Sequence, residues 1–188
     1  MNVVMSLPDE LADAIEQAQL GDARGFEVLL DTFGGSVAGY LRARGVRDSE
    51  GIANEVFLRA FRTIGAFQGD PQRFRAWLFT IAHHAAVDDA RRRRRRISET
   101  PIEYAAEPSG GDVETEVMAR LAHERVRTLL QSLSVDQRAV LELRIIADLS
   151  VEDTAAILGK GYEAVRALQR RGLAALRRTL SDPEGVRQ

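Results

Sequence analysis

Apolar residues recur at three- and four-residue steps through most of the chain, which is the spacing of one face of an α-helix. No segment shows the strict apolar–polar alternation of a half-buried strand, so the pattern predicts an all-α fold. Glycines at residues 21 and 34–35 interrupt the pattern and are expected to end helices there. The predicted helices cover residues 11–18, 26–33, 52–64, 74–94, 117–133, 136–147, 151–158 and 162–180.

The helical pattern is lost between residues 100 and 112, where the sequence TPIEYAAEPSGGD contains two prolines and two adjacent glycines. Such a composition is typical of a linker. We therefore expect two small helical domains, at residues 1–97 and 117–181. A flexible acidic linker at 98–116 joins them, and a tail follows at 182–188.

Charge is strongly segregated along the chain, although the formal net charge is only −2. Residues 1–40 carry −6, residues 41–97 carry +7 and residues 98–118 carry −6, whereas residues 119–162 are neutral and residues 163–188 carry +3. The average charge alone argues against a nucleic-acid partner. The chain nevertheless has two basic blocks on either side of an acidic one. This arrangement favours a polyanionic binding partner such as nucleic acid.

Composition excludes several other classes of protein. Cysteine is absent, so the chain has no disulfide, thiolate zinc site or thiol nucleophile. No apolar run approaches the roughly 20 residues needed to span a bilayer, and the first residues lack the basic and apolar segments of a signal peptide. A cytoplasmic protein is expected.

A helix-turn-helix is predicted near the C-terminus. Ser150 lies at an N-cap position three residues before the acid Asp153, a short helix follows to Gly159, and a longer helix begins after it. The longer helix has one apolar face and an opposite arginine face, formed by Arg166, Arg170, Arg171, Arg177 and Arg178. Such a face fits the major groove, with Arg166 and Arg170 as candidate base-reading residues. The alternative is an amphipathic helix whose arginines are merely solvated.

The first domain contains a second candidate surface for nucleic acid. An apolar helical face that includes Phe74, Trp77 and Ile81 leads into six consecutive arginines at 91–96. A basic ridge bordered by aromatic residues suits single-stranded or melted DNA. Two other interpretations stay open, because Trp77 also fits a core position and an arginine run also fits a solvated helix end or a nonspecific tether.

Metal binding by this segment is the weaker hypothesis. His83, His84 and Asp88 do not assemble three ligands in a polar pocket, so no metal or other cofactor is expected. Asp88 is expected to pair with Arg91 or Arg92, one helical turn away.

Three blocks together resemble bacterial RNA polymerase sigma factors of the extracytoplasmic-function group, in the sigma-70 family. The blocks are LRAR followed by NEVFLRAFR within 41–62, FQGDPQRFRAWLFTIAHHAAVDDARRR at 67–93, and the segment from LLQSLS to LRRTL at 129–180. They occur in the family's order and spacing and cover nearly the whole chain. The resemblance implies a non-enzymatic, alternative sigma factor that binds core RNA polymerase and directs promoter-specific initiation.

The resemblance also implies roles for individual residues. Docking on the clamp of the largest polymerase subunit is implied for Asn54, Glu55, Leu58, Arg59, Phe61 and Arg62. Recognition and melting of the −10 promoter element is implied for Asp70, Arg73, Arg75, Trp77, His83, His84, Arg91, Arg92 and Arg95. Recognition of the −35 element is implied for Arg166, Ala167, Arg170, Arg171 and Arg177.

Further partners follow from the same resemblance. The C-terminal domain is expected to contact the flap of the β subunit, and the acidic linker is expected to thread the active-site cleft and RNA exit channel. An anti-sigma protein is an expected regulator, and direct membrane insertion is not expected.

Two rival hypotheses come from other classes of protein. One is a helix-turn-helix repressor or activator that binds duplex DNA without docking on polymerase. The other is a small metal-dependent phosphohydrolase that uses His83, His84, Asp88 and Asp89.

Overall fold

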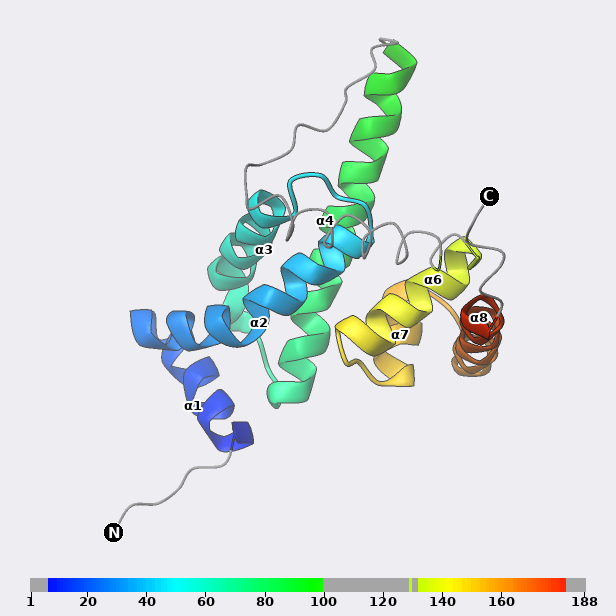
Figure 1. Cartoon of the computed structure of the whole chain (residues 1–188). Coiled ribbons are helices and arrows are strands. Elements are labelled where there is room, and N and C mark those ends of the chain that lie inside the picture. Colours follow the sequence, from blue (N-terminus) through cyan, green and yellow to red (C-terminus); the bar gives the residue numbers. More distant parts are fainter. Residues whose placement is uncertain (1–6, 100–128, 130–131, 182–188) are drawn as a thin grey trace, which may run out of the picture.

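The computed structural model describes residues 7–99, 129 and 132–181, and every regular element in these ranges is helical (Figure 1). The helices form two groups, as the apolar pattern predicted. The predicted tail and nearly all of the predicted linker lie outside the described residues, as does most of the helix predicted at 117–133.

The N-terminal lobe is built from α1 (Leu7–Gln19), α2 (Ala23–Ala43), α3 (Ser49–Thr63), the short 3-10 turn η1 (Ile64–Ala66) and α4 (Pro71–Glu99). Aspartates begin three of these helices by accepting backbone N–H groups that have no partner within the helix. Asp22 accepts from Arg24, Asp48 from Gly51, and Asp70 from Arg73, at 2.8–2.9 Å.

The predicted break at Gly34–Gly35 is wrong, because α2 continues through both glycines. Leu29, Phe33, Val37 and Tyr40 follow one another at helical spacing and are all fully buried. Each glycine costs about 1 kcal/mol in a helix. Burial of this face outweighs that cost.

The C-terminal lobe consists of α6 (Val135–Leu141), the π-helical turn η2 (Glu142–Ile146), α7 (Val151–Leu158) and α8 (Tyr162–Ser181). The helix predicted at 136–147 is therefore two elements. The predicted cap is confirmed, because the Ser150 hydroxyl accepts the Asp153 N–H at 3.0 Å. Gly159 ends α7 with a left-handed φ of 60°, which glycine adopts without a steric penalty.

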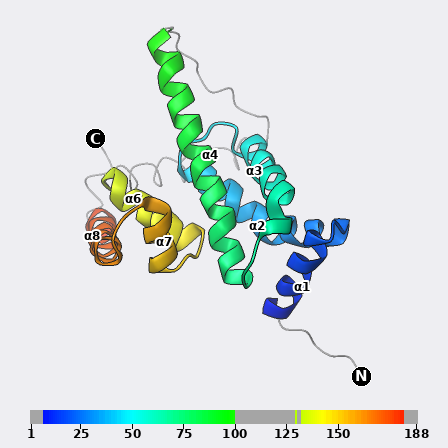
Figure 2. The same cartoon turned by 180° about the vertical axis from the view of Figure 1, so that it is seen from behind.

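The two lobes pack against each other through η2 and the segment that follows it. Leu143, Ala147 and Leu149 belong to the same buried cluster as the core of the N-terminal lobe. Figures 1 and 2 show the C-terminal lobe beside α2 and α4, while the C-terminal half of α4 extends beyond the other helices.

Candidate nucleic-acid interface

The arginine face of α8 is exposed. Val165, Gly172 and Ala175 are buried on the opposite face, whereas all five arginines predicted on the basic face are exposed and Ala167 is half-buried. The Arg166 guanidinium lies 3.5 Å from the Glu163 carboxylate and 5.8 Å from the centre of the Tyr162 ring. Exposed ion pairs of this kind contribute only about 0–1 kcal/mol to stability. The Arg166 side chain can therefore leave Glu163 and bind another acidic group.

Two contacts that the sequence pattern did not indicate hold α8 in place. A Cβ atom at Gly172 would lie 2.9 Å from Leu141 Cδ1, so glycine allows α8 to approach α6 closely. Arg144 in η2 donates to the Gln169 side chain at 3.4 Å and to the Leu149 carbonyl. Arg144 thereby ties α8 to the segment that precedes α7.

The start of α4 contains an aromatic pocket. Trp77 is half-buried, with its ring 5.4 Å from that of Phe67 and 5.5 Å from that of Phe74. It also lines an open pocket of about 430 Å³. The remaining lining residues are Thr63, Ala66, Phe67, Gln68 and Arg73. One part of the Trp77 ring therefore packs on core residues, and another part lines the pocket. A core position and a position at a nucleic-acid surface are thus compatible for this residue.

The loop before α4 is shaped by Gly69. Its φ is 152°, and a Cβ atom there would lie 2.8 Å from the Cβ of Arg73. Asp70 then caps α4 through the Arg73 N–H. The Asp70 carboxylate is thus bonded to the backbone of α4, and Arg73 is one of the residues that line the pocket.

Farther along α4, the residues predicted at the −10 surface have different environments. His84, Arg91, Arg92 and Arg95 are exposed. Asp88 pairs with Arg91 at 3.6 Å, which confirms the expected one-turn pair. Arg75 instead faces the C-terminal lobe, where its guanidinium lies 3.2 Å from the Asp148 carboxylate.

His83 is half-buried, and its Nδ1 lies 2.8 Å from the hydroxyl of the fully buried Tyr40. Burial, together with the positive charge of Arg44, lowers the pKa of His83 to about 4. The ring is consequently neutral at physiological pH and offers DNA no positive charge. Its observed role is to join α2 to α4.

This lowered pKa predicts how stability changes with pH. The unfolded chain binds a proton at His83 more readily than the folded chain, so stability should fall as pH decreases from about 6.5 to about 4. Because the ring is only partly buried and solvent screens its charge, we expect His83 to account for about 2 kcal/mol of that loss, less than the full shift would give. Urea unfolding across this range should show a shallower pH dependence for His83→Gln than for the wild type. Parallel curves would contradict the assignment.

Five of the six predicted polymerase-docking residues lie on the outer side of α3. Asn54, Glu55, Arg59 and Arg62 are exposed. Leu58 is also 55% exposed, although it is apolar. Phe61 differs, because it is half-buried and its ring lies 4.5 Å from that of Phe26. Phe61 therefore anchors α3 to α2 beneath the exposed side chains.

The described residues contain no group of three histidine, cysteine or acidic side chains placed to hold a metal ion. None of their helices is both long and apolar enough to cross a membrane.

Comparison with known proteins identifies both lobes. The family model for Sigma-70 region 2 matches residues 31–96, and that for Sigma-70, region 4 matches residues 129–178. The ECF RNA polymerase sigma factor SigD of Mycobacterium tuberculosis is 34% identical over 182 residues, which cover 92% of this chain and 85% of SigD. The ECF RNA polymerase sigma factor BldN of Streptomyces coelicolor is 33% identical over 175 residues. These residues cover 92% of this chain and 66% of BldN.

Solved structures show the same fold. CnrH, in complex with the cytosolic domain of CnrY, is 27% identical and superposes with a TM-score of 0.68 over 92% of this chain and 98% of CnrH. The sigma factor RpoE of Bartonella quintana, in complex with the anti-sigma factor NepR, has a TM-score of 0.64 at 21% identity, over 86% of this chain and all of RpoE. The chain therefore belongs to the sigma-70 family, in its ECF group of RNA polymerase sigma factors.

Proposed function

We propose that this alternative sigma factor docks on core RNA polymerase through the exposed side of α3, holds the melted −10 element along α4 and reads the −35 element with α8. The observation that carries the proposal is the presence of two separate basic surfaces, one on each lobe. The five α8 arginines form one, and the pocket at Trp77 with the exposed arginines of α4 forms the other.

The two surfaces suit different states of DNA. The α8 face is a convex helix with long, exposed arginines, which can enter the major groove of a duplex. The pocket at Trp77 is concave and partly aromatic, and its volume of about 430 Å³ can accommodate one unstacked base. Contacts to that base offset the few kcal/mol that unstacking costs. Strand separation thus follows from binding, and we propose that the chain performs no chemical reaction.

Regulation by a protein inhibitor is part of the proposal. Both structural relatives were solved in complex with another protein, CnrY or the anti-sigma factor NepR. We infer that an anti-sigma protein binds this chain as well. Because core polymerase and the chromosome are cytoplasmic, the chain is proposed to act there.

The direct test combines the purified chain with bacterial core polymerase and a genomic promoter library. Comigration with core and initiation at discrete sites that core alone ignores are expected. Neither comigration nor initiation by the folded, inhibitor-free chain would overturn the proposal. Duplex binding without polymerase would then favour the repressor or activator hypothesis.

Leu58 provides a test of the docking surface. Leu58→Asp should weaken binding to core polymerase about tenfold, because a charged group would replace an apolar contact at the interface. Leu20→Asp is the matched control, since Leu20 is 88% exposed and lies outside α3. Titration of core with a fluorescent derivative of each variant measures the affinity. Equal affinities for the two variants would remove Leu58 from the docking surface.

A further inference from the structure

The basic face of α8 carries one acidic side chain. Glu163 is the second residue of the helix, and its side chain is 81% exposed. Arg166 and Arg170 follow it after three and seven residues, so the three side chains lie along one stripe of the helix. The buried residues Val165 and Gly172 lie on the opposite side. Glu163 therefore belongs to the surface that the proposed function directs at the −35 element.

An acid at this position has a cost on a surface that binds DNA. An acidic residue in the first turn interacts favourably with the helix dipole, which is the simpler explanation for Glu163. That effect is available at any first-turn position, however, and does not require the stripe that Arg166 and Arg170 share. Close to DNA the same carboxylate is repelled by the phosphates. A hydrogen-bond donor on a base would offset this repulsion, so the position of Glu163 points to such a donor.

The Arg166 guanidinium has a neighbour on either side. It lies 3.5 Å from the Glu163 carboxylate and 5.8 Å from the centre of the Tyr162 ring, within the range of a cation–π contact. The exposed pair with Glu163 is weak, so Arg166 can turn its N–H groups to the O6 and N7 acceptors of a guanine. The carboxylate beside it then has free acceptor positions. The first turn of α8 thus presents donors and an acceptor side by side.

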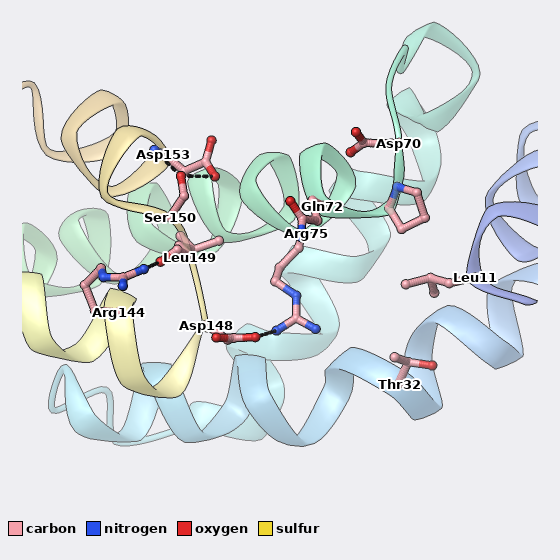
Figure 3. A pocket seen from close by; sticks show the side chains of 11 residues that line it. Leu11, Thr32, Asp70, Gln72, Arg75, Arg144, Asp148, Leu149, Ser150 and Asp153 are labelled. Atoms are coloured by element: carbon pink, nitrogen blue, oxygen red, sulfur yellow. Dashed lines mark hydrogen bonds and ion pairs between the residues drawn. The ribbon is translucent and has the colours of Figure 1, made fainter. Parts of the chain in front are cut away.

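The backbone that carries these side chains is held from two directions. Lys160, in the turn before α8, lies 2.9 Å from Asp136 of α6. Arg144 of η2 donates to the Gln169 side chain at 3.4 Å. Figure 3 shows the second contact of Arg144, to the Leu149 carbonyl at the wall of an open cavity. The first half of α8 is therefore fixed before DNA binds, which limits the conformational entropy lost on binding.

The major-groove edges of the bases determine which partner the carboxylate fits. An ionised carboxylate accepts hydrogen bonds and donates none. Guanine presents two acceptors there, and thymine presents an acceptor and a methyl group, so neither offers a donor. Adenine has an amino group, but its N7 acceptor lies beside that group and repels the second carboxylate oxygen. Cytosine presents only its N4 amino group, so it is the base that Glu163 fits best.

The spacing of the two charged groups matches the step between base pairs. Glu163 and Arg166 are 3.5 Å apart at their tips, and neighbouring base pairs are stacked about 3.4 Å apart. We propose that Glu163 is a specificity-determining residue that accepts a hydrogen bond from N4 of a cytosine in the −35 element, in the base pair next to the guanine that Arg166 binds. This inference rests on the proposed function, because it assigns one base contact to the helix that reads the −35 element.

Binding of the holoenzyme to a promoter library with a randomised −35 element tests this contact. Sequencing of the bound DNA gives the preference at each position for the wild type, Glu163→Gln and Glu163→Ala. We expect the wild type to prefer cytosine about tenfold at one position. Glu163→Gln should change that preference to adenine, because an amide side chain can pair with both N6 and N7. Glu163→Ala should remove the preference at that position and leave the neighbouring guanine preference in place.

Glu152→Gln is the matched control. Glu152 is an exposed acid in the first turn of α7, so this substitution makes the same change of charge at the start of the neighbouring helix. It should leave every base preference unchanged. Urea unfolding of Glu152→Gln and Glu163→Gln measures the part that each acid plays at its helix terminus. An effect on stability alone, without a change of base preference, would make Glu163 a structural residue and overturn the proposal.

The same library separates failure of this inference from failure of the proposed function. Unchanged base preferences in Glu163→Gln, in a holoenzyme whose −35 preferences are lost with Arg166→Ala and Arg170→Ala, would overturn only the cytosine contact. A uniform gain in affinity for all sequences would also overturn it, since the acid would then act only by repelling phosphates. A wild-type holoenzyme without any base preference in the −35 element would overturn the proposed function and the cytosine contact together.

Discussion

Replacing Arg166 and Arg170 together by alanine is expected to weaken binding of the holoenzyme to its promoter by about 2 to 6 kcal/mol, since each arginine that reads a base contributes about 1 to 3 kcal/mol. Both side chains are exposed on the face of α8 opposite its buried residues. Their removal should therefore leave the free energy of unfolding within about 0.5 kcal/mol of the wild type. Quantitative binding to a set of promoters mutated in the −35 element measures the effect.

Arg178→Ala is the matched control for this double substitution. Arg178 is exposed on the same helix, two turns or more beyond the base-reading candidates. If it contacts only phosphate, its loss should reduce the salt dependence and weaken all promoters alike. The double variant should instead lose discrimination among −35 sequences. Retained discrimination in the double variant would show that neither arginine reads bases.

Phe74→Ala is expected to lower the free energy of unfolding by about 3 to 5 kcal/mol, which is a large part of the roughly 5 to 15 kcal/mol that stabilises an ordinary domain. Phe74 is fully buried, and its ring lies 5.7 Å from that of Phe33 and 5.4 Å from that of Phe67. Truncation leaves a cavity beneath Trp77. Urea unfolding of this variant, with Leu20→Ala as the exposed control, measures the loss.

The same substitution should impair promoter melting even where the variant is still folded. The pocket wall formed by Phe67 and Trp77 rests on Phe74, so its loss removes the support for that wall. Permanganate reactivity of unpaired thymines in the −10 region should decrease at temperatures below the unfolding transition. Normal reactivity in the folded variant would show that the pocket does not hold an unstacked base.

The local features of this fold were predictable from sequence, because they depend on neighbours along the chain. The cap at Ser150, the turn at Gly159 and the Asp88–Arg91 pair each involve residues no more than a few positions apart. The error at Gly34–Gly35 has the opposite origin. Glycine generally disfavours a helix, but here α2 is stabilised by burial of its apolar face against other helices. The local sequence pattern does not show which helices those are.

Contacts between distant segments could not be predicted in this way. Nothing near Arg75 in the sequence indicates that Asp148 will pair with it, and nothing near His83 indicates Tyr40. The sequence therefore placed Arg75 and His83 on one predicted helix but did not indicate their partners across the fold. Arg144, which supports α8 from η2, was missed because its two contacts depend on the fold of the whole lobe.

Because α4 is one uninterrupted helix, the distance between the pocket at Trp77 and the arginines farther along the helix is fixed. The helix rises about 1.5 Å per residue, so the 18 steps from Trp77 to Arg95 separate the pocket from this exposed arginine by about 27 Å. That span corresponds to roughly eight nucleotides at about 3.4 Å each. A helix does not stretch to suit a ligand, so under the proposed function the number of residues in α4 sets the spacing between an unstacked base in the pocket and the phosphates bound near Arg95. Under the same proposal, this fixed spacing limits where the melted segment can begin.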